Sequence, residues 1–199
     1  VLTNGVTLRT LERGLPNVLP RSRRPDALAA ARPVHRLDFE TTGLVVVART
    51  AQSLMALSRA FQERRVHKTY RAVVAGRLEG EHVVDLPLDG RDARSRFVAL
   101  EHVPSLKIGW STVVDAHPIT GRMHQLRRHL HHLGHPVLGD RRYVDGPVLR
   151  KNGLFLAAIA VRLPHPVDGT VVEASMPVPP KFAVFLARER RRHARWHGG

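Results

Sequence analysis

Short apolar runs dominate the middle of the chain and indicate strands. The run 44–48 is apolar throughout and rich in β-branched valine, which is typical of a buried strand. Residues 1–34 hold only scattered apolar positions, and this pattern predicts a long irregular segment with one short helix. Glycine, proline and aspartate separate the other strand-like runs, which are predicted at 70–75, 97–102, 111–116, 155–163 and 170–174.

A helical repeat of apolar residues follows the first of these runs. Thr50 is a suitable N-cap, and Leu54, Leu57 and Phe61 fall on one face of the helix that it would begin. The pattern predicts that this helix ends near Arg65.

Two further helices are predicted in the second half of the chain. The first covers about 124–133 and is stopped by Gly134, whereas the second begins at about Pro180 and continues into a basic tail over 188–199. Helices and strands therefore follow one another without regular alternation. This order predicts an α+β fold, with a mixed, mainly antiparallel sheet flanked by helices, in a single domain over residues 1–199.

Composition narrows the class of protein. Of the 199 residues, 43% are hydrophobic and 25% are charged, as in ordinary globular proteins. Cysteine is absent, which excludes disulfides, thiolate nucleophiles and cysteine-ligated metal sites. Because no run approaches the roughly 18 apolar residues of a membrane span, we expect no membrane partner and a cytoplasmic location.

The charge balance points to a polyanionic partner. The chain has 32 lysines and arginines against 17 acidic residues, a formal net charge of +15. Most of these cations are arginines, whose planar guanidinium groups suit phosphate oxygens and base stacking. Nucleic acid is therefore favoured over a membrane surface.

Several familiar chemistries lack their motifs. The sequence has no glycine-rich phosphate loop, no His-Glu-x-x-His and no Gly-x-Ser-x-Gly. Histidines cluster near the second predicted helix, but nearby carboxylates are few, so we expect exposed or RNA-facing histidines rather than a metal site. We therefore predict neither a metal nor a cofactor.

The segment 35–43, His-Arg-Leu-Asp-Phe-Glu-Thr-Thr-Gly, precedes the first predicted strand. A loop at the edge of a rigid sheet can fix the backbone of Asp38 while its carboxylate meets a ligand. Such a carboxylate can act as a nucleophile when it stays ionised. The same residue could equally be a turn or cap residue, and the local pattern does not decide between these roles.

Four ordered blocks together resemble the RluA family of pseudouridine synthases. The first is the segment 35–48, and the second is Lys-Thr-Tyr-Arg-Ala at 68–72. The third is Gly-Arg-Met-His-Gln-Leu-Arg at 121–127 with the turn that follows to residue 140, and the fourth runs from Leu156 to His165-Pro166. Met123, Thr42 and Ala157 depart from the family pattern, and the family's usual opening strand is expected to be missing or divergent here.

The resemblance implies an RNA uridine isomerase that needs no cofactor. It implies Asp38 as the nucleophile, Tyr70 as the active-site tyrosine and Arg127 as the arginine that pairs with Asp38. A flipped uridine in structured ribosomal or transfer RNA would be the substrate, with Arg36 filling the vacated stack. The residues expected to contact RNA are His35, Arg36, Arg122, His124, Gln125, Arg128 and Arg141.

Two other functions remain open. A non-catalytic RNA-binding protein could retain the same scaffold, although Asp38, Tyr70 and Arg127 together argue against it. A metal-dependent nuclease would use the histidine cluster and would be inhibited by a chelator. For the uridine isomerase that the resemblance implies, we expect a monomer.

Overall fold

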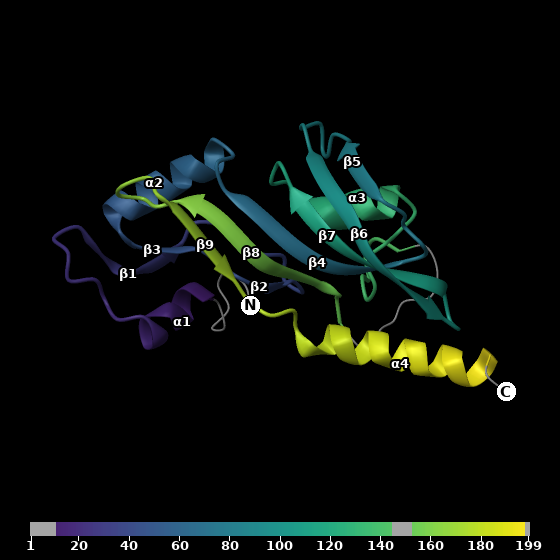
Figure 1. Cartoon of the computed structure of the whole chain (residues 1–199). Coiled ribbons are helices and arrows are strands. Elements are labelled where there is room, and N and C mark those ends of the chain that lie inside the picture. The colour runs from purple at the N-terminus through teal and green to yellow at the C-terminus, as the bar shows by residue number, and fades with distance from the viewer. Residues whose placement is uncertain (1–10, 145–152, 198–199) are drawn as a thin grey trace.

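The computed structural model describes residues 11–144 and 153–197. It is an α+β fold built on one long sheet, as predicted (Figure 1). Six strands follow the order β2-β8-β4-β7-β6-β5, β9 also pairs with β8, and the one parallel pairing within the described sheet is β2 with β8. The elements are α1 (Leu11–Val18), β1 (Ala27–Pro33), β2 (Thr42–Gly43), β3 (Val47–Thr50), α2 (Ala51–Gln62), β4 (His67–Ala75), β5 (Glu81–Asp85), β6 (Arg94–Ser105), β7 (Gly109–Pro118), α3 (Gln125–His132), β8 (Leu156–Pro164), β9 (Val171–Ser175) and α4 (Pro180–His197).

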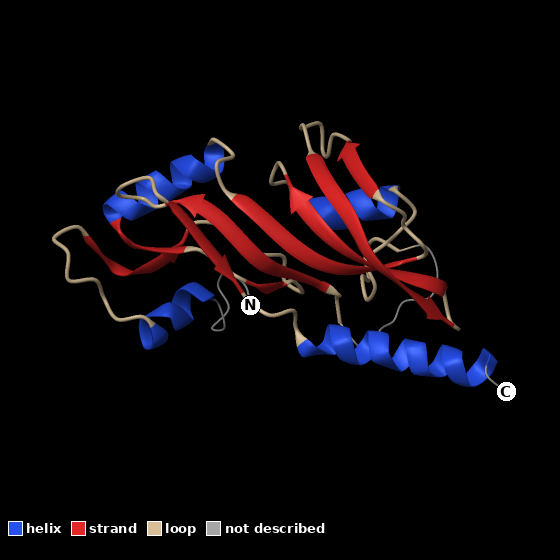
Figure 2. Ribbon diagram, in the orientation of Figure 1, coloured by secondary structure: helices blue, strands red, loops and turns tan. Residues whose placement is uncertain are grey.

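Two apolar clusters stabilise the two ends of this arrangement. The larger contains Phe97, Leu130 and Phe155 and joins the central strands to α3 and α4. The smaller surrounds α2, where Leu57 and Ala60 are buried, and it lies beside the two-stranded sheet of β1 and β3. Figure 2 shows α1, α2 and this small sheet at one end of the long sheet, with α4 beneath the other end.

The predicted helices are present, and local chemistry explains their limits. The side-chain oxygen of Thr50 accepts a hydrogen bond of 3.1 Å from the Ser53 N–H, which caps α2 and typically stabilises a helix by about 1 kcal/mol. This helix ends at Gln62, slightly before the predicted Arg65. Gly134, at φ 78°, follows α3 and terminates it as expected.

The prediction of one buried strand over 44–48 is wrong. Thr42 and Gly43 pair with β8 in the long sheet, whereas Val47 begins β3, which pairs with β1. The apolar run therefore passes from one sheet to the other, and its middle residues are only half-buried. A continuous apolar pattern shows that both ends pack, but it does not show that they pack in the same sheet. The sequence prediction also missed β1 and β5.

The basic segment 188–199 is not a separate tail over its described part. Helix α4 continues through it to His197, and residues 198–199 lie outside the described residues. The buried Glu189 carboxylate accepts a 2.6 Å hydrogen bond from Ser105 on β6, and Arg190 pairs with Glu101 on the same strand. These contacts hold the basic helix against the sheet.

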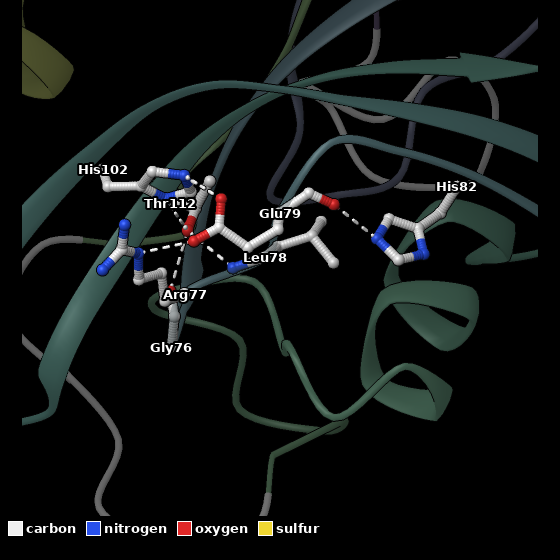
Figure 3. A network of polar contacts seen from close by, with 7 residues as sticks. All are labelled: Gly76, Arg77, Leu78, Glu79, His82, His102 and Thr112. Atoms are coloured by element: carbon white, nitrogen blue, oxygen red, sulfur yellow. Dashed lines mark hydrogen bonds and ion pairs between the residues drawn. The ribbon is translucent and has the colours of Figure 1, made fainter.

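The connection between β4 and β5 is fixed by a polar network (Figure 3). The Glu79 carboxylate lies 2.6 Å from Arg77 Nε and 3.1 Å from His102 Nε2, and its backbone oxygen lies 2.8 Å from His82 Nε2. His102 Nδ1 in turn lies 3.2 Å from the Thr112 hydroxyl. The network joins the connection between β4 and β5 to β6 and β7. These polar residues therefore have a structural role.

Gly43 is a position that no other residue should fill without strain. Its φ is 128°, and a Cβ built there would lie 2.3 Å from the Ala158 carbonyl oxygen. We expect Gly43→Ala to lower the free energy of unfolding by about 3 kcal/mol or more, because backbone strain and overlap add together. Urea denaturation measures this loss.

The matched control is Gly80→Ala, where φ is 68° but nothing lies within 4 Å of the new Cβ. It should show the cost of the backbone conformation without the overlap, about 1–2 kcal/mol. Equal losses in the two variants would show that the approach of Gly43 to β8 is unimportant.

Candidate active site

Asp38 lies in a tightly anchored loop between β1 and β2. Leu37, immediately before it, belongs to the main core, and the Thr41 N–H closes the turn by donating to the Asp38 carbonyl at 2.9 Å. Arg36 and Phe39 on either side are exposed. The buried neighbours fix the backbone, while the Asp38 side chain keeps 21% of its surface accessible. This is the placement that the sequence predicted for a reactive carboxylate.

The loop forms one wall of a cavity of about 700 Å³. Tyr70 on β4 and Leu126 on α3 line other parts of it, so the cavity joins three separate parts of the chain. Its volume lies within the range of small-molecule sites and can accept a nucleobase with its sugar. Among the residues predicted from the sequence, those that line it are His35, Arg36, Asp38, Tyr70, Arg122 and Gln125.

Tyr70 is brought close to Asp38 by the pleat of β4. Its strand neighbours are Ala116 on β7 and Ala158 on β8, two small side chains that leave room beside the ring. Burial, and then the negative charge of Asp38, raise the pKa of the Tyr70 hydroxyl well above its usual range. The hydroxyl therefore keeps its proton and can act as a hydrogen-bond donor inside the cavity.

The cavity wall near Tyr70 also carries a lysine for which no role was predicted from the sequence. Lys68 precedes Tyr70 by two residues, and burial lowers the pKa of its ammonium group. The ammonium lies 5.8 Å from the centre of the Phe61 ring. A two-residue spacing on a strand places both side chains on one face, and this was the available signal for Lys68.

Comparisons with known proteins agree with this geometry. Residues 11–132, more than half of the chain, match the family model described as RNA pseudouridylate synthase. The chain belongs to the RNA pseudouridylate synthase family. The match ends at residue 132, the last residue of α3. It does not include residues 1–10 or the part of the chain after α3.

Individual relatives extend the likeness of this chain to the family. It is 35% identical over 175 residues to "Ribosomal large subunit pseudouridine synthase D" of Nitrosomonas europaea, covering 77% of this chain and 49% of that protein. It is 32% identical to "Ribosomal large subunit pseudouridine synthase C" of Haemophilus ducreyi, covering 83% and 59%. The chain therefore spans about half the length of the curated relatives that it matches.

A solved structure supports the same fold. "Human RNA Pseudouridylate Synthase Domain Containing 1" superposes with a TM-score of 0.71 at 30% identity, covering 84% of this chain and 74% of that one. The likeness confirms the predicted pseudouridine synthase fold and its mainly antiparallel sheet.

Arg127 of this pseudouridylate synthase fold does not form the expected ion pair with Asp38. Its Nε and Nη2 donate to the two carboxylate oxygens of Asp140 at 2.6 and 2.7 Å, and both side chains are almost fully buried. Burial opposes its charge, but the bonds to Asp140, with the nearby charges of Asp140 and Asp38, raise the pKa of Arg127. Asp38 therefore acts on Arg127 only as a nearby charge. The sequence pattern could not identify Asp140 as the partner, because the turn after α3 brings it there.

His124 lies beside Asp38 instead. Its Nε2 lies 3.9 Å from Asp38 Oδ1, and the two side chains are 17% and 21% exposed. An RNA contact was predicted for His124 from the sequence. Its proximity to Asp38 was not predicted.

Two other predicted RNA contacts are engaged within the protein. Gln125 donates from its amide to the Arg94 carbonyl at 2.8 Å and accepts from the Thr120 hydroxyl at 2.6 Å. Its buried amide thus shapes the loop before α3, and a contact of Gln125 with RNA stays a prediction. Arg128 forms a two-pronged ion pair with Asp89 at 2.8 and 3.1 Å.

His35 and Arg141 differ in accessibility. His35 stacks on Phe61, and its Nε2 accepts a hydrogen bond from the Val46 N–H at 2.9 Å. Burial, and then the charge of Lys68, lower the pKa of His35 to about 4, so it is neutral near pH 7. Arg141 is exposed. His35 therefore supports the cavity wall, and a role for Arg141 in RNA binding stays a prediction.

The histidines near α3 point in different directions. His129 is fully buried, with its ring nitrogens 3.0 Å from the Ser95 hydroxyl and 3.1 Å from the Leu86 carbonyl. His135 Nδ1 lies 2.8 Å from the Ala75 carbonyl. His129 is a core histidine, which corrects the expectation of exposed or RNA-facing side chains. Over residues 11–144 and 153–197, no cluster of three or more residues has the arrangement of a metal site.

No helix in the described part of the chain is long and apolar enough to cross a membrane.

Proposed function

We propose that this chain is an RNA pseudouridine synthase that isomerises selected uridines in structured RNA, with Asp38 as its nucleophile. The observation that carries the proposal is the meeting of Asp38 and the protonated Tyr70 hydroxyl in one cavity large enough for a nucleotide. The names of the relatives favour ribosomal RNA as the substrate, ahead of transfer RNA.

The reaction requires no change of oxidation state. The bond between N1 of uracil and C1′ of ribose breaks, the base turns, and a bond forms between C5 and C1′. The proton lost from C5 is balanced by one gained at N1. Asp38 bonds transiently to the ribose or to a base carbon and is released with the product.

The surrounding residues would hold the base and the RNA. Tyr70 would stack on the uracil and donate a hydrogen bond to it, while Leu126 and Leu156 exclude water from the cavity. A stacked uridine must first be flipped out, at a cost of a few kcal/mol. Arg36, exposed at the cavity wall, would occupy the gap left in the stack. Arg122 and Arg141 would contact backbone phosphates and contribute a salt-dependent part of the affinity.

The substrate is identified by mapping pseudouridine in total RNA from cells with and without this protein. Loss of specific sites in ribosomal RNA, restored by the wild-type gene, is the expected result. Loss of sites confined to transfer RNA would assign the other substrate. If removal of the protein from cells that normally express it left the pseudouridine map unchanged, this result would contradict the proposal.

We expect purified protein to remain active in EDTA and without nucleotide or redox cofactor, because the rearrangement is internal. The measurement is tritium release from RNA labelled at uracil C5. RNA refolded in magnesium before chelation is the control for RNA structure. Loss of activity that one divalent ion restores, with the RNA fold unchanged, would support metal chemistry instead.

A further inference from the structure

His124 adopts a conformation that is unusual for a residue with a side chain. Its φ of 53° and ψ of 24° are left-handed, at the position just before α3. A non-glycine residue in this region costs about 1–2 kcal/mol. The side chain does not compensate by capping the helix, because it makes no capping hydrogen bond. Strain of this kind commonly accompanies a functional constraint.

The ring is held at one nitrogen and faces Asp38 with the other. Nδ1 lies 3.0 Å from the Tyr143 hydroxyl, and Nε2 lies 3.9 Å from Asp38 Oδ1. The rings of His124 and Tyr143 also pack edge to face, at an interplanar angle of 74°. This arrangement fixes the direction in which Nε2 points.

Tyr143 is itself held by the buried pair behind the site. Its backbone N–H donates to Asp140 Oδ1 at 3.0 Å, and its ring lies 5.2 Å from the Arg127 guanidinium and 5.6 Å from that of Arg142. Asp140 therefore anchors both Arg127 and Tyr143. The chain of contacts runs from Asp140 through Tyr143 and His124 to Asp38.

Burial favours the neutral form of His124. Burial lowers the pKa of His124, and Arg127 and Arg142 lower it further, against the opposing effects of Asp38 and Asp140. A neutral ring interacts best with a carboxylate when the nitrogen that faces it carries the proton. Nδ1 must then accept the hydrogen bond, with the Tyr143 hydroxyl as its donor.

We propose that Tyr143 and His124 form a positioning pair for Asp38, in which Tyr143 fixes the ring tautomer and the His124 Nε2–H orients the Asp38 carboxylate. The inference rests on the proposed function. The distance of 3.9 Å is about 1 Å longer than a hydrogen bond and closes when RNA fills the cavity, as catalytic contacts commonly tighten with substrate bound. His124 thus acts through Asp38 rather than as an RNA contact.

Two substitutions at His124 separate this role from a structural one. The amide nitrogen of glutamine overlaps Nε2, whereas that of asparagine overlaps Nδ1 and leaves nothing to reach Asp38. We expect His124→Asn to lower the single-turnover rate on the order of 100-fold, with the dissociation constant for RNA within about threefold. His124→Gln should keep the rate within about tenfold of wild type. The probe is a C5-tritiated transcript that spans a mapped ribosomal site.

Tyr143 is tested in the same assay by a double-mutant cycle. Tyr143→Phe keeps the ring on Arg127 but removes the hydroxyl, and should lower the rate about tenfold. In the His124→Asn background it should have no further effect, because Tyr143 acts through His124. His132→Asn, an exposed residue on α3, is the matched control and should be fully active.

The outcomes are distinct. Wild-type rates in His124→Asn, weakened RNA binding at an unchanged rate, or independent effects of the two substitutions would each overturn the positioning pair. Thermal melting checks that each variant folds, and asparagine tolerates the left-handed backbone better than glutamine does. Absence of tritium release from the wild-type chain would overturn the proposed function itself, and this inference with it.

Discussion

Replacing Asp38 with asparagine is expected to reduce tritium release by at least about a thousandfold, to the detection limit, because an amide keeps the shape of the carboxylate but cannot act as the nucleophile. Affinity for RNA should stay within a few-fold, since Asp38 contributes no positive charge. Stability should also be preserved, because the side chain is 21% exposed and lies at the cavity rather than in the core. Single-turnover kinetics with C5-tritiated RNA, together with filter binding, measure both effects.

The control for this substitution is Asp168→Asn. Asp168 is an exposed carboxylate in the turn between β8 and β9, where it contacts His165 and Thr170. This variant should retain full activity. If Asp38→Asn turned over RNA at a rate near wild type, the protein would be an RNA-binding scaffold or an enzyme with a different nucleophile.

Replacing Arg127 with methionine is expected to destabilise the protein by about 3–5 kcal/mol. The reason is that the substitution leaves the Asp140 carboxylate buried without its partner, and breaking such a pair by removing one side is costly. Activity should fall as well, since Arg127 supplies positive charge near Asp38 and a surface for the Tyr143 ring. Urea denaturation and single-turnover rates separate the two losses.

The double variant Arg127→Met with Asp140→Leu tests the explanation. It removes both charges and should recover much of the stability, but not all, because Asp140 also accepts from the N–H groups of Arg142 and Tyr143. The rate should remain low. A loss below about 1 kcal/mol in Arg127→Met would contradict a buried, two-pronged pair.

Arg36→Ala provides a comparison with a different expected defect. Arg36 is exposed, so stability should be unchanged, and its loss should slow the reaction less on RNA whose target uridine is already unpaired. Relaxing the RNA should not rescue Arg127→Met. Equal rescue of both variants would show that the two arginines do not have separate roles.

Local patterns in the sequence determined most of the elements, and the resemblance to a family singled out the two central residues of the proposed site. The cap at Thr50, the apolar stripe of α3 and its stop at Gly134 are set by neighbours within a few residues, which the sequence displays directly. Asp38 and Tyr70 were recognisable because each lies in a motif that resembles the family pattern. Their meeting in one cavity follows from the family fold that those motifs predicted.

Tertiary structure alone decided the pairings between distant segments. The run 44–48 connects two sheets. It follows β2, which pairs with β8 more than a hundred residues away, and it ends in β3, which pairs with β1 about fifteen residues away. His129 can be a core residue because the Ser95 hydroxyl and the Leu86 carbonyl are hydrogen-bond partners for its two ring nitrogens. Arg127 pairs with Asp140 rather than Asp38, and His124 faces Asp38 through a left-handed backbone that no pattern of residue types announced. The partners of charged and aromatic side chains depend on their positions and desolvation in three dimensions. The periodicity of apolar residues in the sequence indicates only which face of an element is apolar.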